Sequence, residues 1–405
     1  MRKSYLTVAL LVAGLFTLSS TQAQEPIRIG DISPFTGPLA QPASEFAAGH
    51  ELAADVINAR GGVLGRKVVV IRGDAGNPQQ GISAVEKLVN QDKVDLFMGT
   101  YGSALANAAS DAALRYNKFY WETASLAQEL TERGLPNFAR GGPNAAIYAE
   151  SSVKSALEVI APKLGKKADQ LKVWIEHEES VYGTSIAQMQ KKLFETAGVK
   201  VVGVGAHNFR AIDLNDAILR ARGATPDIWV LTGYVPDSTL LLRTMRDQGY
   251  VPPAILMLGT GDGREFQQAL GGFMDGIFVV NYPHEDVVPR FAPGAAAFME
   301  AYRKKYGREP SSPYLVLVGY TSTMILFDVI ASAGGTDVDK MRAAVAAIDK
   351  PPYTYANGYG AKFDAKMQNT RAFTNLTQWQ KGRSVTVYPN EMAAPGVVLV
   401  NIPRK

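Results

Sequence analysis

The chain has 405 residues, of which 46% are hydrophobic and 20% are charged, a composition that allows two globular domains and excludes a disordered chain. Its 42 basic and 38 acidic side chains give a formal net charge of +4, too small for the basic surface of a nucleic-acid-binding protein. The sequence has no cysteine, which excludes disulfides, thiolate metal sites and a cysteine nucleophile.

The first 23 residues have the three-part pattern of a secretory signal peptide. Arg2 and Lys3 precede an apolar run over residues 6–18, and small polar residues then lead to Ala23, after which we predict cleavage. The apolar run is too short for a membrane-spanning helix, which needs about 20 residues. We expect no later segment to span a membrane, so the sequence predicts an exported, soluble protein.

Behind this leader, short strand-like runs alternate with amphipathic helical stretches. In the first part, strands are predicted at 27–32, 68–71, 94–99 and 118–122, with helices at 45–60, 80–89 and 105–116. The rhythm restarts with strands at 171–175, 199–204, 228–231 and 255–258, and with helices at 185–197, 214–221 and 238–247. Alternation of this kind predicts βαβ units with parallel strands and right-handed crossovers. The predicted fold class is therefore α/β, with two doubly wound parallel-sheet lobes joined by a multi-strand hinge.

The last third of the chain adds no third sheet. Two helices are predicted at about 295–305 and 314–333, and a hairpin within 373–388. The expected division gives 24–143 plus 276–345 to lobe one and 144–275 plus 346–405 to lobe two. Because ligands of open α/β sheets bind at the carboxyl ends of the strands, two such edges facing each other predict a binding cleft.

Four stretches, in order along the chain, carry a family resemblance. They are IGDISPFTGP at 29–38, INARGGVLGRK at 57–67, GTYGSA at 99–104 followed by ASD at 109–111, and TAS at 123–125 followed by ELTERG at 129–134. Together they resemble the branched-chain amino-acid class of periplasmic binding proteins over the whole chain after the leader. The resemblance implies the type I periplasmic binding protein fold and a solute receptor that serves an ABC importer.

The segment 99–103 ends a strand and precedes a helix. Free N–H groups at a helix N-terminus, together with a hydroxyl, favour a carboxylate. The resemblance puts the ligand carboxylate at Ser103; the alternative is that Ser103 is only the N-cap of the helix.

The next strand ends at the same edge of the sheet. There the resemblance implies that Ala124 offers its carbonyl to an ammonium and that position 126 touches the ligand. Leu126 stands where amino-acid binders have Thr, which departs from the usual amino-acid mode. Glu122 either contacts the ligand or pairs with a nearby basic group. The ligand contacts predicted in lobe one are Tyr101, Ser103, Glu122, Ala124, Ser125 and Leu126.

In lobe two, two tyrosines follow strands and precede helices. The resemblance implies that Tyr182 and Tyr234 close over the ligand, whereas helix capping or hinge packing is the alternative for each. It also implies an acid for the ligand ammonium, for which Asp262 is the best match and Asp237 the second choice. Pro42 falls where the family has an aromatic residue in its side-chain pocket.

These observations predict a periplasmic receptor of an ABC importer, which binds a small carboxylate-bearing ligand. We expect a hydrophobic or branched-chain amino acid, no cofactor, no metal, no nucleic acid, a monomer, and permease subunits as partners. The alternative is a ligand sensor of the same fold for amides or aromatic carboxylates. An enzyme is not expected, because the sequence offers no nucleophile–base pair and the histidines lack metal-ligand spacing. These histidines are His50, His177, His207 and His284.

Overall fold

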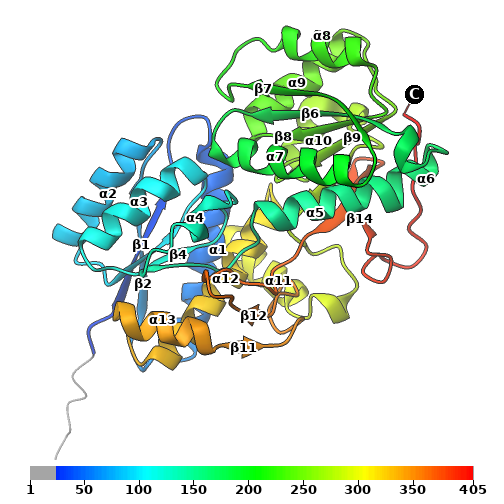
Figure 1. The fold of residues 1–405 in the computed structure, drawn as a ribbon. Helices are drawn as coiled ribbons and strands as arrows, with labels where there is room; N and C mark the ends of the chain where they lie inside the picture. Colours follow the sequence, from blue (N-terminus) through cyan, green and yellow to red (C-terminus); the bar gives the residue numbers. More distant parts are fainter. Residues whose placement is uncertain (1–23, 405) are drawn as a thin grey trace, which may run out of the picture.

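The computed structural model describes residues 24–404, so the predicted signal peptide and its cleavage site at Ala23 lie outside the described residues. Two lobes lie side by side, the first mainly blue to cyan and the second mainly green in Figure 1. The first lobe contains a five-stranded, wholly parallel sheet with the order β2-β1-β3-β4-β5. Its strands are β1 (Ile27–Ser33), β2 (Val68–Asp74), β3 (Leu96–Gly99), β4 (Tyr120–Glu122) and β5 (Phe138–Arg140).

Helices cover both faces of this sheet. Successive strand residues point to opposite faces, so Leu96 and Met98 join a core with Phe46, whereas Phe97 joins a second core with Leu105. Three early helices supply these contacts: α1 (Ala40–Ala59), α2 (Pro78–Asn90) and α3 (Ser103–Arg115). Three late helices join the same lobe: α11 (Ala295–Tyr306), α12 (Pro313–Ala333) and α13 (Val338–Ala347). The late helices therefore pack against lobe one, to which the sequence analysis assigns them.

The second lobe repeats the topology of the first. Its seven-stranded sheet has the order β14-β13-β10-β9-β8-β6-β7, in which β7-β6-β8-β9-β10 are parallel and reproduce the order of the first sheet. These strands are β6 (Lys172–Glu178), β7 (Lys200–His207), β8 (Ile228–Thr232), β9 (Ala254–Leu258) and β10 (Phe278–Asn281). The helices are α5 (Ala145–Ser155), α7 (Val181–Thr196), α8 (Asn215–Ala224), α9 (Val235–Asp247) and α10 (Arg264–Leu270). The predicted α/β class with two parallel-sheet lobes is confirmed.

The boundary between the lobes differs from the expected division in two places. Strand β10 pairs with β9 and with the hairpin strand β13 (Asn375–Gln380), so residues 276–281 belong to the second sheet. The reason is that the parallel alternation runs for one more unit than the sequence division allowed. Conversely, β12 (Ala361–Lys362) and Gln368 lie against lobe one, since Gln368 bridges to Arg140 of β5. The hairpin of β13 with β14 (Arg383–Tyr388) extends the second sheet, as expected for the tail.

The chain therefore passes between the lobes three times, after β5, after β10 and before β13. The first passage uses the Gly141–Pro143 segment, and Asn144 then caps α5 by accepting a hydrogen bond from the Ile147 N–H at 3.0 Å. Three connecting segments allow the lobes to rotate about one hinge while each sheet stays intact.

Helix α12 corrects the expectation that no later segment could span a membrane. Among the described residues it is the one helix long and apolar enough to do so, with a mean hydropathy of 1.7. However, 72% of its apolar window is buried inside the protein, where it packs along α1. Its apolar character is that of a central core helix.

Candidate functional site

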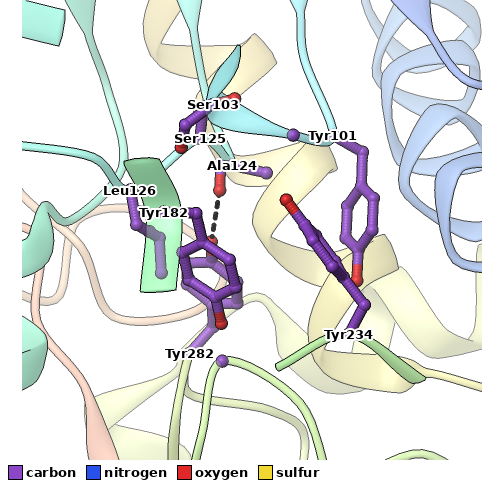
Figure 2. A pocket seen from close by; sticks show the side chains of 10 residues that line it. Tyr101, Ser103, Ala124, Ser125, Leu126, Tyr182, Tyr234 and Tyr282 are labelled. Atoms are coloured by element: carbon purple, nitrogen blue, oxygen red, sulfur yellow. Dashed lines mark hydrogen bonds between the residues drawn. The ribbon is translucent and has the colours of Figure 1, made fainter. Parts of the chain in front are cut away.

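A cavity lies between the lobes, where the carboxyl ends of strands from both sheets face each other. Figure 2 shows the side chains that converge on it from lobe one and lobe two. The lining residues are Tyr101, Gly102, Ser103, Ala124, Ser125, Leu126, Tyr182, Tyr234, Gly259 and Tyr282. Seven of the nine predicted site residues are in this set, and Glu122 and Asp262 are not.

One end of the cavity is the N-terminus of α3. Gly102 is the N-cap residue, at a φ of 119° that favours glycine, and it has no capping side chain. Ser103 is 1% exposed, and its Oγ accepts a hydrogen bond from the Ala127 N–H at 3.1 Å. Ser103 is therefore not the helix cap, and its hydroxyl hydrogen can still be donated to an anion in the cavity. The first N–H groups of the helix point toward the same end.

The segment after β4 supplies the adjoining wall. The Ala124 carbonyl accepts a hydrogen bond from the Tyr282 hydroxyl at 3.1 Å, and Ser125 donates from Oγ to the Thr100 carbonyl at 2.8 Å. Leu126 is buried and lines the cavity with its side chain. A carbonyl oxygen has two lone pairs, so Ala124 can accept one more donor.

Glu122 contacts the backbone and does not line the cavity, which corrects the predicted direct contact. Its Oε1 accepts four backbone N–H groups, from Thr100, Thr123, Ala124 and Ser125, at 2.8–3.0 Å. Burial raises the pKa of Glu122 to about 7, against the lowering effect of these four donors. Glu122 thus holds together the two loops that carry Ser103 and Ala124.

Tyrosines from both lobes close the cavity. Tyr182, in the first turn of α7, donates from its hydroxyl to the Leu258 carbonyl at 3.3 Å. The Tyr234 ring, just before α9, lies 5.8 Å from the ring of Tyr101 in lobe one and 5.2 Å from that of Tyr182. Burial raises the pKa of Tyr182 and of Tyr234 well above the usual value, so both hydroxyls stay neutral donors. Contact between Tyr101 and Tyr234 means that the lobes are closed here.

The two predicted acids of lobe two do not reach this cavity. Asp262 lies in a separate cavity, where its Oδ1 accepts a hydrogen bond from Thr377 Oγ1 at 2.6 Å. Asp237 is buried behind Tyr234 and pairs with His207 Nε2 at 2.9 Å. Both carboxylates follow strands at the carboxyl edge of the second sheet, but each forms hydrogen bonds with partners in its own lobe.

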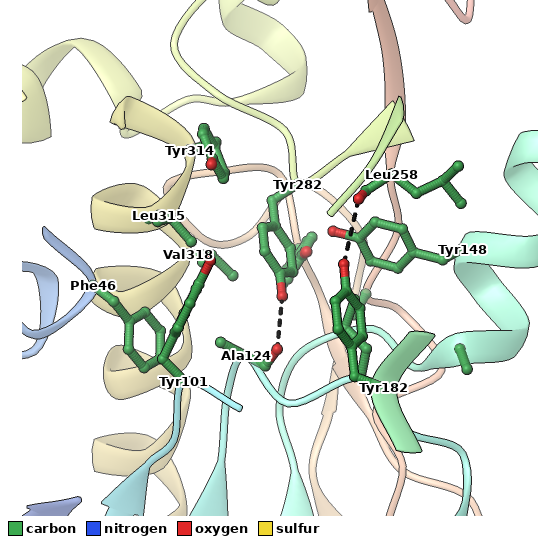
Figure 3. Close-up of a cluster of buried hydrophobic side chains, with 14 of the residues drawn as sticks. Phe46, Tyr101, Ala124, Tyr148, Tyr182, Leu258, Tyr282, Tyr314, Leu315 and Val318 are labelled. Carbon is green, nitrogen blue, oxygen red and sulfur yellow. Dashed lines mark hydrogen bonds between the residues drawn. The ribbon is translucent and has the colours of Figure 1, made fainter. Parts of the chain in front are cut away.

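Pro42 also lies outside the cavity lining, since it is buried within α1. A residue that the sequence analysis missed is Tyr282, which lines the cavity and donates to Ala124 (Figure 3). Tyr282 follows β10 directly, so the rule that ligands sit at the carboxyl ends of strands would have found it. The sequence analysis assigns residues 276–281 to lobe one and so does not place Tyr282 at the edge of the second sheet.

The site is a neutral, aromatic cavity with a helix N-terminus at one end. All of its lining side chains are uncharged, so the helix N-terminus and Ser103 are its strongest electrostatic feature. Among the described residues, no group of three or more His, Asp or Glu side chains is placed to hold a metal ion.

Comparisons with known proteins agree with this architecture. The family profile described as periplasmic binding protein matches residues 26–383. A protein named Leu/Ile/Val-binding protein homolog 7 from Brucella suis is 36% identical over 392 residues, covering 96% of each chain. Leu/Ile/Val-binding protein homolog 8 from the same organism is also 36% identical and covers 97% of this chain and 98% of its own.

Solved structures share the fold at lower identity. The substrate-binding protein LivJ from Streptococcus pneumoniae, in complex with isoleucine, has a TM-score of 0.76 and 22% identity, and the match covers 89% of this chain and 99% of LivJ. A solute-binding protein from R. palustris, in complex with benzoate, has a TM-score of 0.75 and 19% identity, and the match covers 94% of this chain and 99% of that one. At these identities the likeness concerns the fold alone.

Proposed function

The chain belongs to the periplasmic binding protein family, and from that premise we propose that it captures a small carboxylate between its lobes for an ABC importer. It is a binding protein and not an enzyme. The observation that carries the proposal is the N-terminus of α3 with Ser103, which presents N–H groups and a hydroxyl to a buried cavity.

The body of the ligand would lie against Leu126, Tyr182 and Tyr234, which suits a half-apolar molecule. A branched-chain or other hydrophobic amino acid is the first candidate, and it is supported by the names of relatives that are 36% identical. The ammonium of such a ligand would be accepted by the second lone pair of the Ala124 carbonyl, beside the hydroxyl of Tyr282.

A carboxylate without an ammonium, such as an aromatic acid, is the second candidate. It is favoured by one observation: none of the side chains that line the cavity is an acid, since Asp262 and Asp237 are both turned elsewhere. An ammonium buried without a counter-ion would lose much of its hydration energy. The relative from R. palustris that shares this fold was solved with benzoate.

Export and transport complete the proposal. The leader would be removed after Ala23, and the protein would act as a monomer in the periplasm. The closed lobes would then present a surface to the membrane subunits of the importer, and a ligand that binds the closed form better than the open form would increase the closed fraction.

The test is a thermal-shift series on the ligand-free protein over residues 24–405. Leucine is compared with 4-methylpentanoate, which lacks the ammonium, with 3-methylbutylamine, which lacks the carboxylate, and with benzoate. A ligand that binds only the folded state raises the melting temperature according to its affinity and concentration. We expect leucine to give the largest shift and the amine to give none. Shifts with 4-methylpentanoate or benzoate but not with leucine would select the second candidate, and a shift with the amine alone would overturn the carboxylate site.

Ser103→Ala isolates the anion-binding end of the cavity. We expect it to weaken binding of the active carboxylate by about tenfold or more, because a hydrogen bond to a charged group is lost. Ser110→Ala is the matched control in the same helix, since Ser110 donates to the Ala106 carbonyl at 2.7 Å and lies outside the cavity lining. Equal losses in the two variants would assign the Ser103 effect to the helix and not to the ligand.

A further inference from the structure

A second cavity lies beside the first and shares none of its lining residues. Its walls come from the loop after β9, the segment after β10, the β13–β14 hairpin and the start of α12. The stacked rings of Tyr282 and Tyr314, with centroids 6.4 Å apart, stand between the two cavities, since Tyr282 lines the first and Tyr314 the second. Both lobes therefore contribute to the second cavity.

Four polar side chains in its wall carry a buried atom without a hydrogen-bond partner among the described residues. Two of these atoms are Glu285 Oε2 and the Tyr314 hydroxyl, and the other two belong to Asp262 and His284. Asp262 is 6% exposed, and its Oδ1 accepts hydrogen bonds from Thr377 and Ser384, whereas its Oδ2 has no partner among the described residues. His284 is 5% exposed, and its Nε2 is likewise without a partner in the described part of the chain. Buried polar atoms in folded proteins are nearly always paired, so these two atoms call for a ligand.

The charges in the wall favour a cation. Glu285 Oε2 lies 3.5 Å from His284 Nδ1, and Asp262 and Asp286 act on the same ring. Burial acts to lower the pKa of His284, but these carboxylates raise it to about 9. Nδ1 also accepts a hydrogen bond from the Asp286 N–H at 3.3 Å, which leaves the hydrogen of the neutral ring on Nε2, so Nε2 is a donor in either protonation state. Both arginines of the lining, Arg264 and Arg383, are exposed at the rim, and Arg264 lies 3.9 Å from Glu309. Away from the rim, three carboxylates against one imidazole leave an excess of negative charge around this ring.

We propose that this second cavity binds the head group of a small primary amine that carries an oxygen acceptor beside its ammonium. The ammonium would donate to Asp262 Oδ2, an acceptor left unpaired, and its positive charge would offset the excess carboxylate. The neighbouring oxygen would accept from His284 Nε2. A solute with both groups satisfies the unpaired acceptor of Asp262 and the unpaired donor of His284, whereas a simple metal cation satisfies only carboxylates.

Ethanolamine is the probe, because it carries an ammonium next to a hydroxyl and no apolar body for the first cavity. Trp379 provides the signal, since its indole lines the second cavity and donates from Nε1 to the Gly261 carbonyl at 2.7 Å, one residue before Asp262. We expect a saturable change in tryptophan fluorescence of the ligand-free protein with ethanolamine. Sodium chloride at equal ionic strength and tetramethylammonium, which has no N–H donor, should give no such change, and Trp379→Phe should abolish the signal.

Asp262→Asn should weaken ethanolamine by about tenfold or more, because the charged partner of a buried hydrogen bond is lost. Glu285→Gln is a second variant with a more accessible side chain, and it should weaken ethanolamine several-fold even if Asp262→Asn does not fold. Both variants should keep the response to the carboxylate series, which depends on Ser103. Absence of a saturable change, an equal response to tetramethylammonium, or unchanged affinity in both folded variants would overturn the proposal. Loss of the carboxylate response in folded Asp262→Asn would also overturn it, by placing Asp262 in the first site.

Discussion

Glu122 and Ser103 both lie where lobe one meets the cleft, yet they act in different ways. Ser103 faces the cavity and has a hydroxyl hydrogen that it can donate. Glu122, in contrast, accepts hydrogen bonds from four backbone N–H groups of the protein itself. A sequence places both residues at the correct edge of the sheet. It does not reveal that the loops on either side turn their N–H groups toward one carboxylate oxygen, because this depends on the fold of two distant segments.

Glu122→Gln tests the pH dependence that this arrangement creates. The pKa of Glu122 is raised from its usual value to about 7 in the folded protein, so the folded state binds the proton more tightly than the unfolded state. The stabilisation is fully present below the unfolded pKa and is lost as the pH rises through about 7. From the size of the shift we expect the loss to be at most about 3 kcal/mol in the wild type. Urea unfolding at about pH 5 and pH 8 measures it.

In Glu122→Gln this pH-dependent part should disappear, because the amide does not titrate. Other buried groups whose pKa values are raised, such as Glu265 and Asp237, affect both proteins equally, so the difference between the two pH slopes isolates Glu122. Identical slopes would mean that Glu122 titrates near its ordinary pKa, which would make its four N–H donors the dominant influence.

At the scale of elements, α1 and α12 make the most extensive helix–helix contact in lobe one. Both helices bring a glycine to the crossing, and a Cβ on Gly319 would lie 2.5 Å from the Phe46 carbonyl oxygen. A Cβ on Gly49 would overlap the Val316 carbonyl oxygen and lie 2.6 Å from the Tyr320 nitrogen. Two backbones in contact cannot yield as side chains do, so these glycines fix the spacing of the helices that carry Phe46 and Tyr314.

Gly49→Ala should therefore destabilise the protein by about 2–3 kcal/mol, as overpacking against a backbone does. The measurement is the free energy of unfolding in urea. Gly223→Ala is the matched control, because Gly223 is an exposed residue of α8 with open space around it. That control should be neutral or stabilise the protein by up to about 1 kcal/mol through helix propensity. A neutral result for Gly49→Ala would show that α1 can move away from α12 at little cost.

The elements themselves follow from hydrophobic periodicity, and nearly all the predicted strands and helices occur close to the expected residues. Hydrophobic periodicity is a poorer guide to which lobe each element belongs to. Strand β10 is as apolar as any other, and only its pairing with β9 and β13 shows which sheet it joins. Such long-range pairing cannot be recognised from the local sequence. Because β10 was assigned to the wrong lobe, Tyr282 was not predicted as a residue of the site.

At the scale of the whole molecule, the site is formed by residues from both lobes. Tyr101, Ser103 and Leu126 could be predicted, because each follows a strand whose end is visible in the sequence. Asp262 also follows a strand, but its loop turns the carboxylate to Thr377 and Ser384 of the terminal hairpin. The hairpin is more than a hundred residues away in the chain, so the orientation of Asp262 could not be read from its own segment.

Closure of the lobes depends on aromatic contact more than on polar contacts at the rim. Tyr234 is 7% exposed, and its ring meets Tyr101 across the cleft. Tyr234→Ala removes this aromatic contact, so the closed state should lose stability relative to the open state. Because the ligand binds the closed state, its apparent affinity should fall by about tenfold or more. Small-angle X-ray scattering should show that the variant with ligand keeps a larger radius of gyration than the wild type with ligand.

Arg210→Ala is the comparison that separates aromatic from polar closure. Arg210 in lobe two donates from Nη2 to the Gly76 carbonyl of lobe one at 3.3 Å, but this contact is exposed. An exposed hydrogen bond contributes only about 0.5–1 kcal/mol, so the affinity should change by less than about fivefold. If Arg210→Ala weakened binding as much as Tyr234→Ala, closure would depend on the loop at the mouth of the cleft. The tyrosines would then shape the cavity without holding the lobes together.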